Sequence, residues 1–232
     1  MIPERSHCAS VRLAVFDCDG TLVDSQHSIV AAMHAACDAH DFARPGAEAV
    51  RRMVGLPLEE AFARLMPDEG AEAHARLRES YRDFFGALRR AGEVKEPLFP
   101  GVIEGLSALE DAGWLLGVAT GKARRGLMAT LEKHDLADRF VTLQTADVAH
   151  GKPHPEMLLR AMADTGAEAH RTVMVGDTTF DMEMARNAGT MSIGVAWGYH
   201  EAEELRSAGA LAVVGDFADL ARAMDTVVEA HG

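Results

Sequence analysis

The stretch Val11-Arg-Leu-Ala-Val-Phe16, followed by Asp17-Cys18-Asp19-Gly20-Thr21, decides the fold of this chain. Its first half is apolar apart from one arginine and has the length of a strand, which predicts a buried β-strand. The Asp, Gly and Thr residues that come next are typical of a turn. We therefore expect a strand over 11–16 that ends in a loop carrying two carboxylates, those of Asp17 and Asp19.

After residue 97 the chain alternates between strand-like and helix-like segments. Such alternation is typical of parallel strands joined by right-handed crossovers in a doubly wound, Rossmann-like α/β sheet, and we expect that fold class here. The further strands are expected at 114–119, 140–143, 172–175, 192–195 and 211–214, and the helices at 102–112, just after 122, and at 155–165, 182–187 and 216–229.

Residues 25–96 have a different texture, because apolar residues recur at helical spacing and no strand pattern is present. Glycine and proline breakers divide the block, which predicts a bundle of roughly four helices. We expect this block to be an all-α cap domain inserted after the first strand. The α/β core domain would then comprise residues 1–24 and 97–232.

The composition is that of a soluble globular protein, since 48% of the 232 residues are hydrophobic and 25% are charged. The formal net charge of −13 repels nucleic acid and anionic membranes, so we expect neither as a partner. No apolar run has the length of a leader or a membrane span. Cys8, Cys18 and Cys37 form no disulfide or zinc pattern, which favours a cytoplasmic setting. We expect a monomer or a homodimer.

Polar side chains follow several of the expected strands. Asp17 and Asp19 follow the first, Thr120 follows the second, and Asp177 follows the fourth. Because ligands of open α/β sheets bind beyond the carboxyl ends of the strands, we expect these residues to meet at one edge of the sheet. Lys152 lies in a Gly-Lys-Pro loop that opens a helix and is expected at the same edge.

These residue types suit phosphate-ester chemistry. Asp17 can attack phosphorus and form an acyl phosphate, while Asp19 can serve as general acid. Mg²⁺ would offset the repulsion between Asp17 and an anionic substrate, with Asp177 and Asp181 completing its site.

Positive charge and hydrogen bonds for the phosphate oxygens are expected from other residues of the same edge. The Lys152 ammonium and the Thr120 hydroxyl can bind phosphate directly. The backbone amides of Gly121 and Lys122, at the start of a helix, form an anion cradle. The expected ligand is therefore a small-molecule phosphate ester.

Four segments, in this order, resemble the motifs of the haloacid dehalogenase superfamily of phosphatases, in the branch with an inserted helical cap. They are Asp17-Cys-Asp19-Gly-Thr21-Leu-Val, Val118-Ala-Thr120-Gly-Lys122, Gly151-Lys152-Pro153 and Gly176-Asp177-Thr-Thr-Phe-Asp181. The resemblance covers essentially the whole chain.

The resemblance implies a role for each matched residue. Asp17 would be the nucleophile and Asp19 the acid/base. Mg²⁺ would be bound by the side chains of Asp17 and Asp177 and the backbone carbonyl of Asp19. Asp181 would support the metal site through water or through Lys152, and the helical block would be a mobile cap. Dehalogenases of the superfamily lack an aspartate two positions after the nucleophile, so Asp19 favours phosphate esters.

The same resemblance bears on the substrate. Residues 54–58 match the specificity loop of related capped enzymes, and Leu58 stands where β-phosphoglucomutase-like proteins have an arginine. Hydrolysis of a phosphoglycolate-like ester or a sugar phosphate is therefore expected. A phosphomutase stays open, because Arg51 or Arg52 could replace that arginine. A phosphate-binding regulator without turnover is a third alternative, although binding alone does not need Asp19.

Several of these residues also have plain structural explanations. Thr120 and Asp177 could simply cap helices, Asp181 could be a solvated helix residue, and Cys18 could be a buried thiol. His150 and His154 lack a carboxylate or cysteine companion at ligand spacing and are expected to be ordinary loop residues. Trp197-Gly-Tyr199 is expected to pack in a loop.

Overall fold

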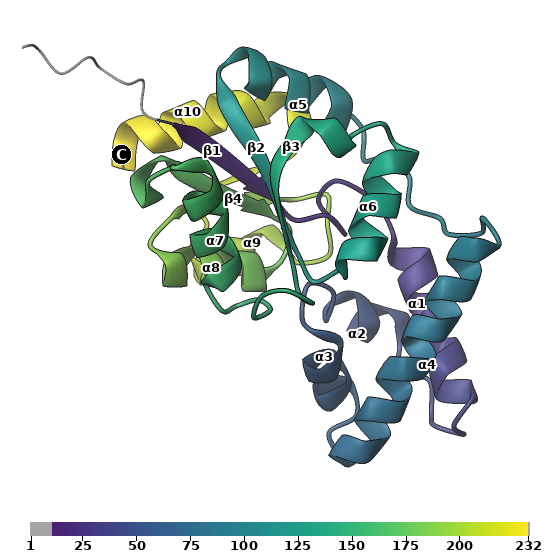
Figure 1. Cartoon of the computed structure of the whole chain (residues 1–232). Helices are drawn as coiled ribbons and strands as arrows, with labels where there is room; N and C mark the ends of the chain where they lie inside the picture. The colour runs from purple at the N-terminus through teal and green to yellow at the C-terminus, as the bar shows by residue number, and fades with distance from the viewer. Residues whose placement is uncertain (1–10, 232) are drawn as a thin grey trace, which may run out of the picture.

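A computed structural model describes residues 11–231, whose centre is a six-stranded parallel sheet of order β3-β2-β1-β4-β5-β6 (Figure 1). The expected doubly wound α/β class is confirmed. Cys8 and the first ten residues of the expected core domain, like residue 232, lie outside the described residues. The strands are β1 (Arg12–Phe16), β2 (Trp114–Thr120), β3 (Phe140–Thr145), β4 (Thr172–Gly176), β5 (Met191–Val195) and β6 (Ala212–Val214).

Helices cover both faces of the sheet, because its central strands bury both of their sides. In β1, Leu13 and Val15 belong to one apolar cluster and Ala14 and Phe16 to the other, as the alternation of side chains along a strand requires. On the Phe16 side lie α5 (Val102–Asp111), α6 (Arg124–Lys133) and α10 (Leu220–His231), and on the Val15 side lie α7 (Glu156–Thr165) and α8 (Thr179–Ala188), with α9 (Ala202–Ala208) packed against α8.

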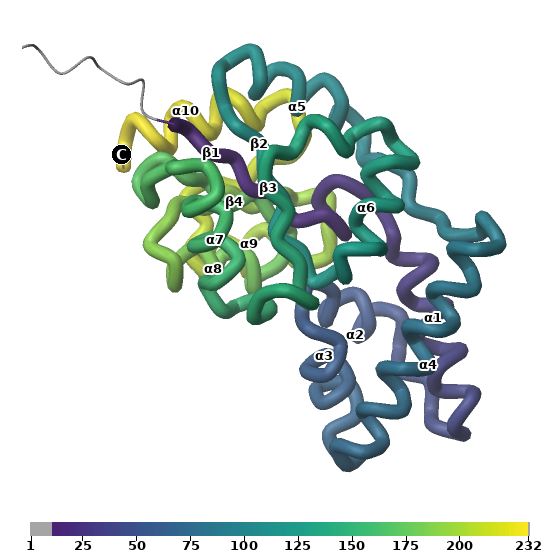
Figure 2. Tube along the Cα trace, in the orientation of Figure 1, coloured from purple at the N-terminus to yellow at the C-terminus, as the bar shows by residue number. Residues whose placement is uncertain are grey.

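Residues 26–90 form the four helices expected for this block, set apart from the sheet in Figures 1 and 2. They have an apolar core of their own, in which Phe62 and Leu77 are fully buried. No helix among residues 11–231 is both long enough and apolar enough to cross a membrane. The four helices are α1 (Gln26–Asp38), α2 (Ala47–Arg51), α3 (Leu58–Leu65) and α4 (Ala71–Arg90).

The helix pattern differs from expectation at α8, α9 and α10, the last of which begins at Leu220 instead of 216 because a 3-10 turn, Phe217–Asp219, precedes it. The short helix α9 is missed by the sequence pattern; it is only 7 residues long and begins with a capping box made by Glu201 and Glu204 rather than by Ser, Thr or Asp. Helix α8 begins at Thr179 instead of 182, because Thr178 and Asp181 form a second capping box there. Asp181 therefore lies in the first turn of α8, and Asp177 lies just before the helix.

Candidate active site

The site forms at the carboxyl ends of β1, β2 and β4, which are neighbours in the sheet. Asp17 follows β1, Thr120 is the last residue of β2, and Asp177 follows β4. The amide of Asp17 donates a hydrogen bond of 2.9 Å to the carbonyl of Val175, so the pairing of β1 with β4 extends to Asp17 itself. The sheet thus holds the backbone of Asp17 rigidly.

A buried lysine lies between two aspartates. Nζ of Lys152 is 2.7 Å from Oδ2 of Asp17 and 2.6 Å from Oδ1 of Asp181, and all three side chains are at most 1% exposed. Burial opposes the charge of the lysine, but the carboxylates of Asp17 and Asp181 outweigh it and raise the pKa of Lys152. The ammonium is therefore held as a cation.

Asp177 completes a group of three buried carboxylates with Asp17 and Asp181, which offer ligand atoms within 4.8 Å of one another. Burial raises the pKa of Asp17 to about 6, against the opposing effect of Lys152. Burial, and then the neighbouring carboxylates, raise the pKa of Asp177 well above its usual range. Lys152 pairs with Asp17 and Asp181 but not with Asp177, so the group holds more carboxylates than cations. Its all-oxygen donor set suits a hard divalent cation.

Two hydrogen bonds, from residues of two different loops, hold the carboxylate of Asp177 in place. The Thr21 hydroxyl donates to Oδ1 and the amide of Tyr199 donates to Oδ2, each at 2.9 Å. Gly20 has a φ of +86°, and a Cβ at Gly20 or at Gly198 would overlap the Asp177 side chain. Glycine is therefore required at both close approaches to this carboxylate.

Asp19 lies in the loop after β1 and is held by a different cation. Its Oδ1 is 2.7 Å from Nζ of Lys122 and accepts a hydrogen bond of 2.5 Å from the Ser25 hydroxyl. Burial opposes the charge of the lysine, but Asp19 outweighs it and raises the pKa of Lys122. The expected buried thiol is confirmed next to it, since Cys18 packs in the core and burial raises its pKa well above the usual range.

Thr120 does not cap a helix, because α6 begins after Ala123. Its hydroxyl accepts a hydrogen bond of 3.2 Å from the amide of Lys122. The sequence predicts that the amides of Gly121 and Lys122 lie at the start of a helix. They belong instead to the turn between β2 and α6. A Cβ at Gly121 would lie 2.9 Å from the carbonyl oxygen of Gly55.

Asp181 combines a structural contact with a site contact. Its Oδ2 accepts hydrogen bonds from the amide and the hydroxyl of Thr178, at 3.1 and 2.7 Å, which caps α8. Its Oδ1 faces Lys152. The reading of Asp181 as a solvated helix residue is wrong, because its side chain is fully buried.

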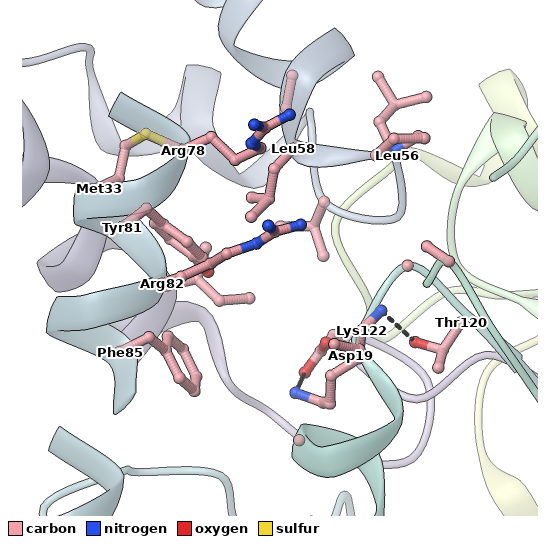
Figure 3. A pocket seen from close by; sticks show the side chains of 18 of the residues that line it. Asp19, Met33, Leu56, Leu58, Arg78, Tyr81, Arg82, Phe85, Thr120 and Lys122 are labelled. Carbon is pink, nitrogen blue, oxygen red and sulfur yellow. Dashed lines mark hydrogen bonds and ion pairs between the residues drawn. The ribbon is translucent and has the colours of Figure 1, made fainter. Parts of the chain in front are cut away.

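A cavity of about 570 Å³ separates these residues from the helical block. Asp17 and Gly121 line it from the sheet side. Asp19, Thr120 and Lys122 lie on the same side (Figure 3). Residues 54–58 of the helical block line it as well, so the expectation that this loop reaches the site is confirmed. The other lining residues of the helical block include Ile29, Met33, Arg78, Tyr81, Arg82 and Phe85.

Sequence reasoning missed three contacts of the site. The sequence predicts a role for the backbone amide of Lys122 but not the pairing of its side chain with Asp19, although Lys122 is one of four lysines in the chain. Ser25 was not considered. Tyr199 was assigned to loop packing, yet its amide binds Asp177. The glycine before Tyr199, in the turn after β5, is the signal that could have found this contact.

The reading of His150 and His154 also needs correction. Their rings lie 4.6 Å apart and Glu156 joins them, with Nδ1 of His150 against its carboxylate, so a carboxylate companion exists. Both histidines are exposed, unlike the buried Lys152 between them. Neither lines the cavity.

Comparison with known proteins agrees with this geometry. Residues 14–195 match the family model described as haloacid dehalogenase-like hydrolase. A protein of Dickeya dadantii named probable phosphatase IndB is 40% identical over 94% of this chain and 95% of its own length. A phosphoglycolate phosphatase of Vibrio vulnificus is 32% identical over 94% of this chain and 96% of its own.

Solved structures show the same fold. The crystal structure of a hydrolase from Pseudomonas syringae has a TM-score of 0.80 and 28% identity, covering 93% of this chain and 98% of that one. A structure from Clostridium acetobutylicum, named a predicted phosphatase, has a TM-score of 0.83 and 28% identity over 94% of this chain and 100% of its own. The chain is an enzyme that belongs to the haloacid dehalogenase-like hydrolase family.

Proposed function

We propose that the protein is a Mg²⁺-dependent phosphatase that hydrolyses a small phosphomonoester through an aspartyl-phosphate intermediate on Asp17. One observation carries the proposal: Asp17, Asp177 and Asp181 form a buried group in which Lys152 pairs with Asp17 and Asp181, and Asp17 lines the cavity together with Asp19. The relatives named phosphatases support it.

Each half of the reaction uses the same two aspartates. The Asp17 carboxylate attacks phosphorus while the bond from phosphorus to the leaving oxygen breaks, and Asp19 gives that oxygen a proton. Asp19 then takes a proton from water, whose oxygen attacks phosphorus. The bond between phosphorus and the Asp17 oxygen breaks, which releases inorganic phosphate and restores the Asp17 carboxylate. The ion pair with Lys122 and the hydroxyl of Ser25 keep Asp19 in place for both transfers.

The remaining residues of the site bind charge. Lys152, the Thr120 hydroxyl and the Gly121 amide would bind the oxygens of the transferring phosphate. The side chains of Asp17 and Asp177 and the carbonyl of Asp19 would hold Mg²⁺, with Asp181 acting through Lys152 or water. When bound, this ion supplies positive charge that offsets the repulsion between the carboxylates and the phosphate.

Residues 25–96 are proposed to act as a cap domain over a core made of residues 1–24 and 97–232. Closure of the cap would exclude water from the phosphate site until the leaving group departs. A cytoplasmic location is proposed with it, because Cys18 and Cys37 are free and buried. Phosphoglycolate-like esters and sugar phosphates are the substrates to test first, given the names of the relatives.

The possibility that Arg51 or Arg52 replaces the arginine of a phosphomutase is weakened. Neither Arg51 nor Arg52 lines the cavity, and Arg52 forms an ion pair with Glu204 of α9 instead. Leu58 does line the cavity, in the place where the related mutases have arginine. Hydrolysis is therefore the preferred outcome.

The test is turnover of p-nitrophenyl phosphate by the purified protein, with Mg²⁺ and with EDTA. We expect turnover only with Mg²⁺, and a loss of at least about 1,000-fold in Asp17→Asn. Asp111→Asn, at an exposed position at the end of α5, is the matched control and should keep full activity. Undiminished turnover by Asp17→Asn would refute the proposal.

A further inference from the structure

The wall of the cavity opposite the phosphate site has a composition that the proposed reaction does not use. Successive turns of α4 place Tyr81 and Phe85 in one row and Arg78 and Arg82 in the row beside it, because residues four apart share a helix face. We call this face the helical wall. It offers an aromatic surface and cations at the same time.

The aromatic row is continuous. The rings of Tyr81 and Phe85 lie 5.8 Å apart between centroids, and Phe62 packs edge-on against Tyr81 from behind at 6.5 Å. Met33 of α1 lies on the same side of the cavity (Figure 3). The row is therefore a stable apolar surface against which a flat group can pack.

The cations differ in whether they are already paired. Arg78 contacts Glu59 at 3.2 Å, and Arg89 contacts the buried Glu96 at 3.3 Å. Arg82, Arg90 and Arg125 line the cavity without an ion pair or a side-chain hydrogen bond to any residue in 11–231, and Arg82 is the one of the three that lies on the helical wall. Figure 3 shows its side chain extending from α4 across the cavity, on the side that faces Asp19 and Lys122. In a chain of net charge −13, a free guanidinium aimed into a cavity marks a place for an anion.

The size of the cavity limits what accompanies that anion. At about 570 Å³ it lies in the range that holds drug-sized ligands, and a two-carbon acid would leave most of it unfilled. A leaving group with an apolar, ring-sized body would bury the helical wall. A charge at its far end would meet Arg82.

We propose that the substrate is a phosphomonoester whose leaving group has an apolar, ring-sized body ending in a second anionic group, held by the helical wall through Arg82. The proposal rests on the proposed phosphatase function, which supplies the bond that is broken. It assigns Arg82 as a residue that determines specificity and gives it no part in the bond-breaking step.

The test compares benzyl phosphate, 4-carboxybenzyl phosphate and 2-phosphoglycolate as substrates. The two benzyl esters have similar leaving alcohols, so the ratio of their kcat/KM values reports the remote carboxylate alone. We expect 4-carboxybenzyl phosphate to exceed each of the other two by at least about tenfold, the effect of one charge-assisted hydrogen bond or one buried ring. Arg82→Gln should reduce the ratio of the benzyl esters to about one. Arg76→Gln, an exposed arginine of α4 that does not line the cavity, should leave that ratio unchanged.

Each other outcome has a distinct meaning. An equal loss on both benzyl esters in Arg82→Gln would assign Arg82 to the transferring phosphate and overturn the inference. A wild-type ratio near one would do the same, as would a preference for phosphoglycolate over the carboxybenzyl ester. Failure to hydrolyse any phosphate ester, including p-nitrophenyl phosphate, would overturn the proposed function and this inference with it.

Discussion

The two sides of the cavity are built on opposite principles. On the sheet side, Asp17 lines the cavity and belongs to a buried group with Asp177, Asp181 and Lys152, in which Lys152 pairs with Asp17 and Asp181; we call this group the charged floor. On the helical wall, Arg82 is exposed and unpaired within the described residues. The floor is organised before substrate arrives, which transition-state stabilisation requires. Arg82 of the helical wall has no partner among the described residues, which fits its proposed role in selecting the substrate.

The largest effect is expected from removing Lys152, the one cation of the charged floor. Lys152→Met leaves Asp17 and Asp181 buried without their ion-pair partner, and breaking a buried pair costs about 3–5 kcal/mol of unfolding free energy. Urea unfolding measures the loss, and turnover should disappear with it. Lys133→Met is the control, since this half-exposed lysine lies 3.9 Å from Glu96 and should cost less than about 1 kcal/mol. Equal stability of the two variants would show that charge does not hold the floor together.

A second variant, at Asp177 of the charged floor, should lower activity without lowering the unfolding free energy. Asp177→Asn removes one of three buried carboxylates, and an amide can still bind Thr21 and the Tyr199 amide. We expect kcat/KM to fall by at least about 100-fold, while the metal-free protein keeps its unfolding free energy or gains about 1 kcal/mol. Melting curves with and without Mg²⁺ should show a shift for the parent and none for the variant. A variant that still responds to Mg²⁺ would place the ion elsewhere.

The third prediction disturbs the contact between the loop that carries Lys152 and the 54–58 loop of the helical block. A Cβ at Gly151 would overlap Cγ of Pro57, so Gly151→Ala should push the 54–58 loop away from the Lys152 loop. We expect kcat/KM to fall by about tenfold and the unfolding free energy by about 1–3 kcal/mol. Gly70→Ala, where the new methyl meets nothing within 4 Å, should leave kcat/KM unchanged. Equal kinetics for both variants would show that this contact does not position the loop.

The contrast between the two sides also explains what sequence could predict. The apolar run before Asp17 and the strand pattern before Asp177 place both carboxylates at one sheet edge, because parallel strands end on the same side. The pairing of Lys122 with Asp19 follows from no local pattern. It depends on how the turn after β2 packs against the loop after β1, 103 residues earlier in the chain.

The helical wall was still less accessible to sequence reasoning. Helical spacing predicts that Tyr81 and Phe85 share a face, but the same spacing is typical of residues in the core of a bundle. Only the placement of α4 across the cavity shows that this face meets the site. The Tyr199 amide is a similar case, because a backbone donor leaves no trace in residue identity.

The smallest effect is expected at the ion pair that joins the helical block to the core. Arg52, just after α2, binds Glu204 of α9, and both side chains are more than a third exposed. Solvent screens such pairs, so Glu204→Gln should reduce the unfolding free energy at pH 7 by less than about 1 kcal/mol. A double-mutant cycle with Arg52→Gln would measure the coupling itself.

The contribution of this pair to the unfolding free energy should depend on pH, in a direction that follows from the pKa of Glu204. The hydrogen bond from Arg52 lowers the pKa of Glu204 below its ordinary value of 4.5 in the folded protein. A carboxyl whose folded pKa is depressed contributes stability above its unfolded pKa and loses it as the pH falls through the folded pKa. The difference between the parent and Glu204→Gln should thus be constant from pH 7 to about pH 5 and shrink below pH 4.5. A difference that grows on acidification would mean that the pair does not stabilise the joint, and that contacts such as Gly151 with Pro57 hold the helical block to the core without help from charge.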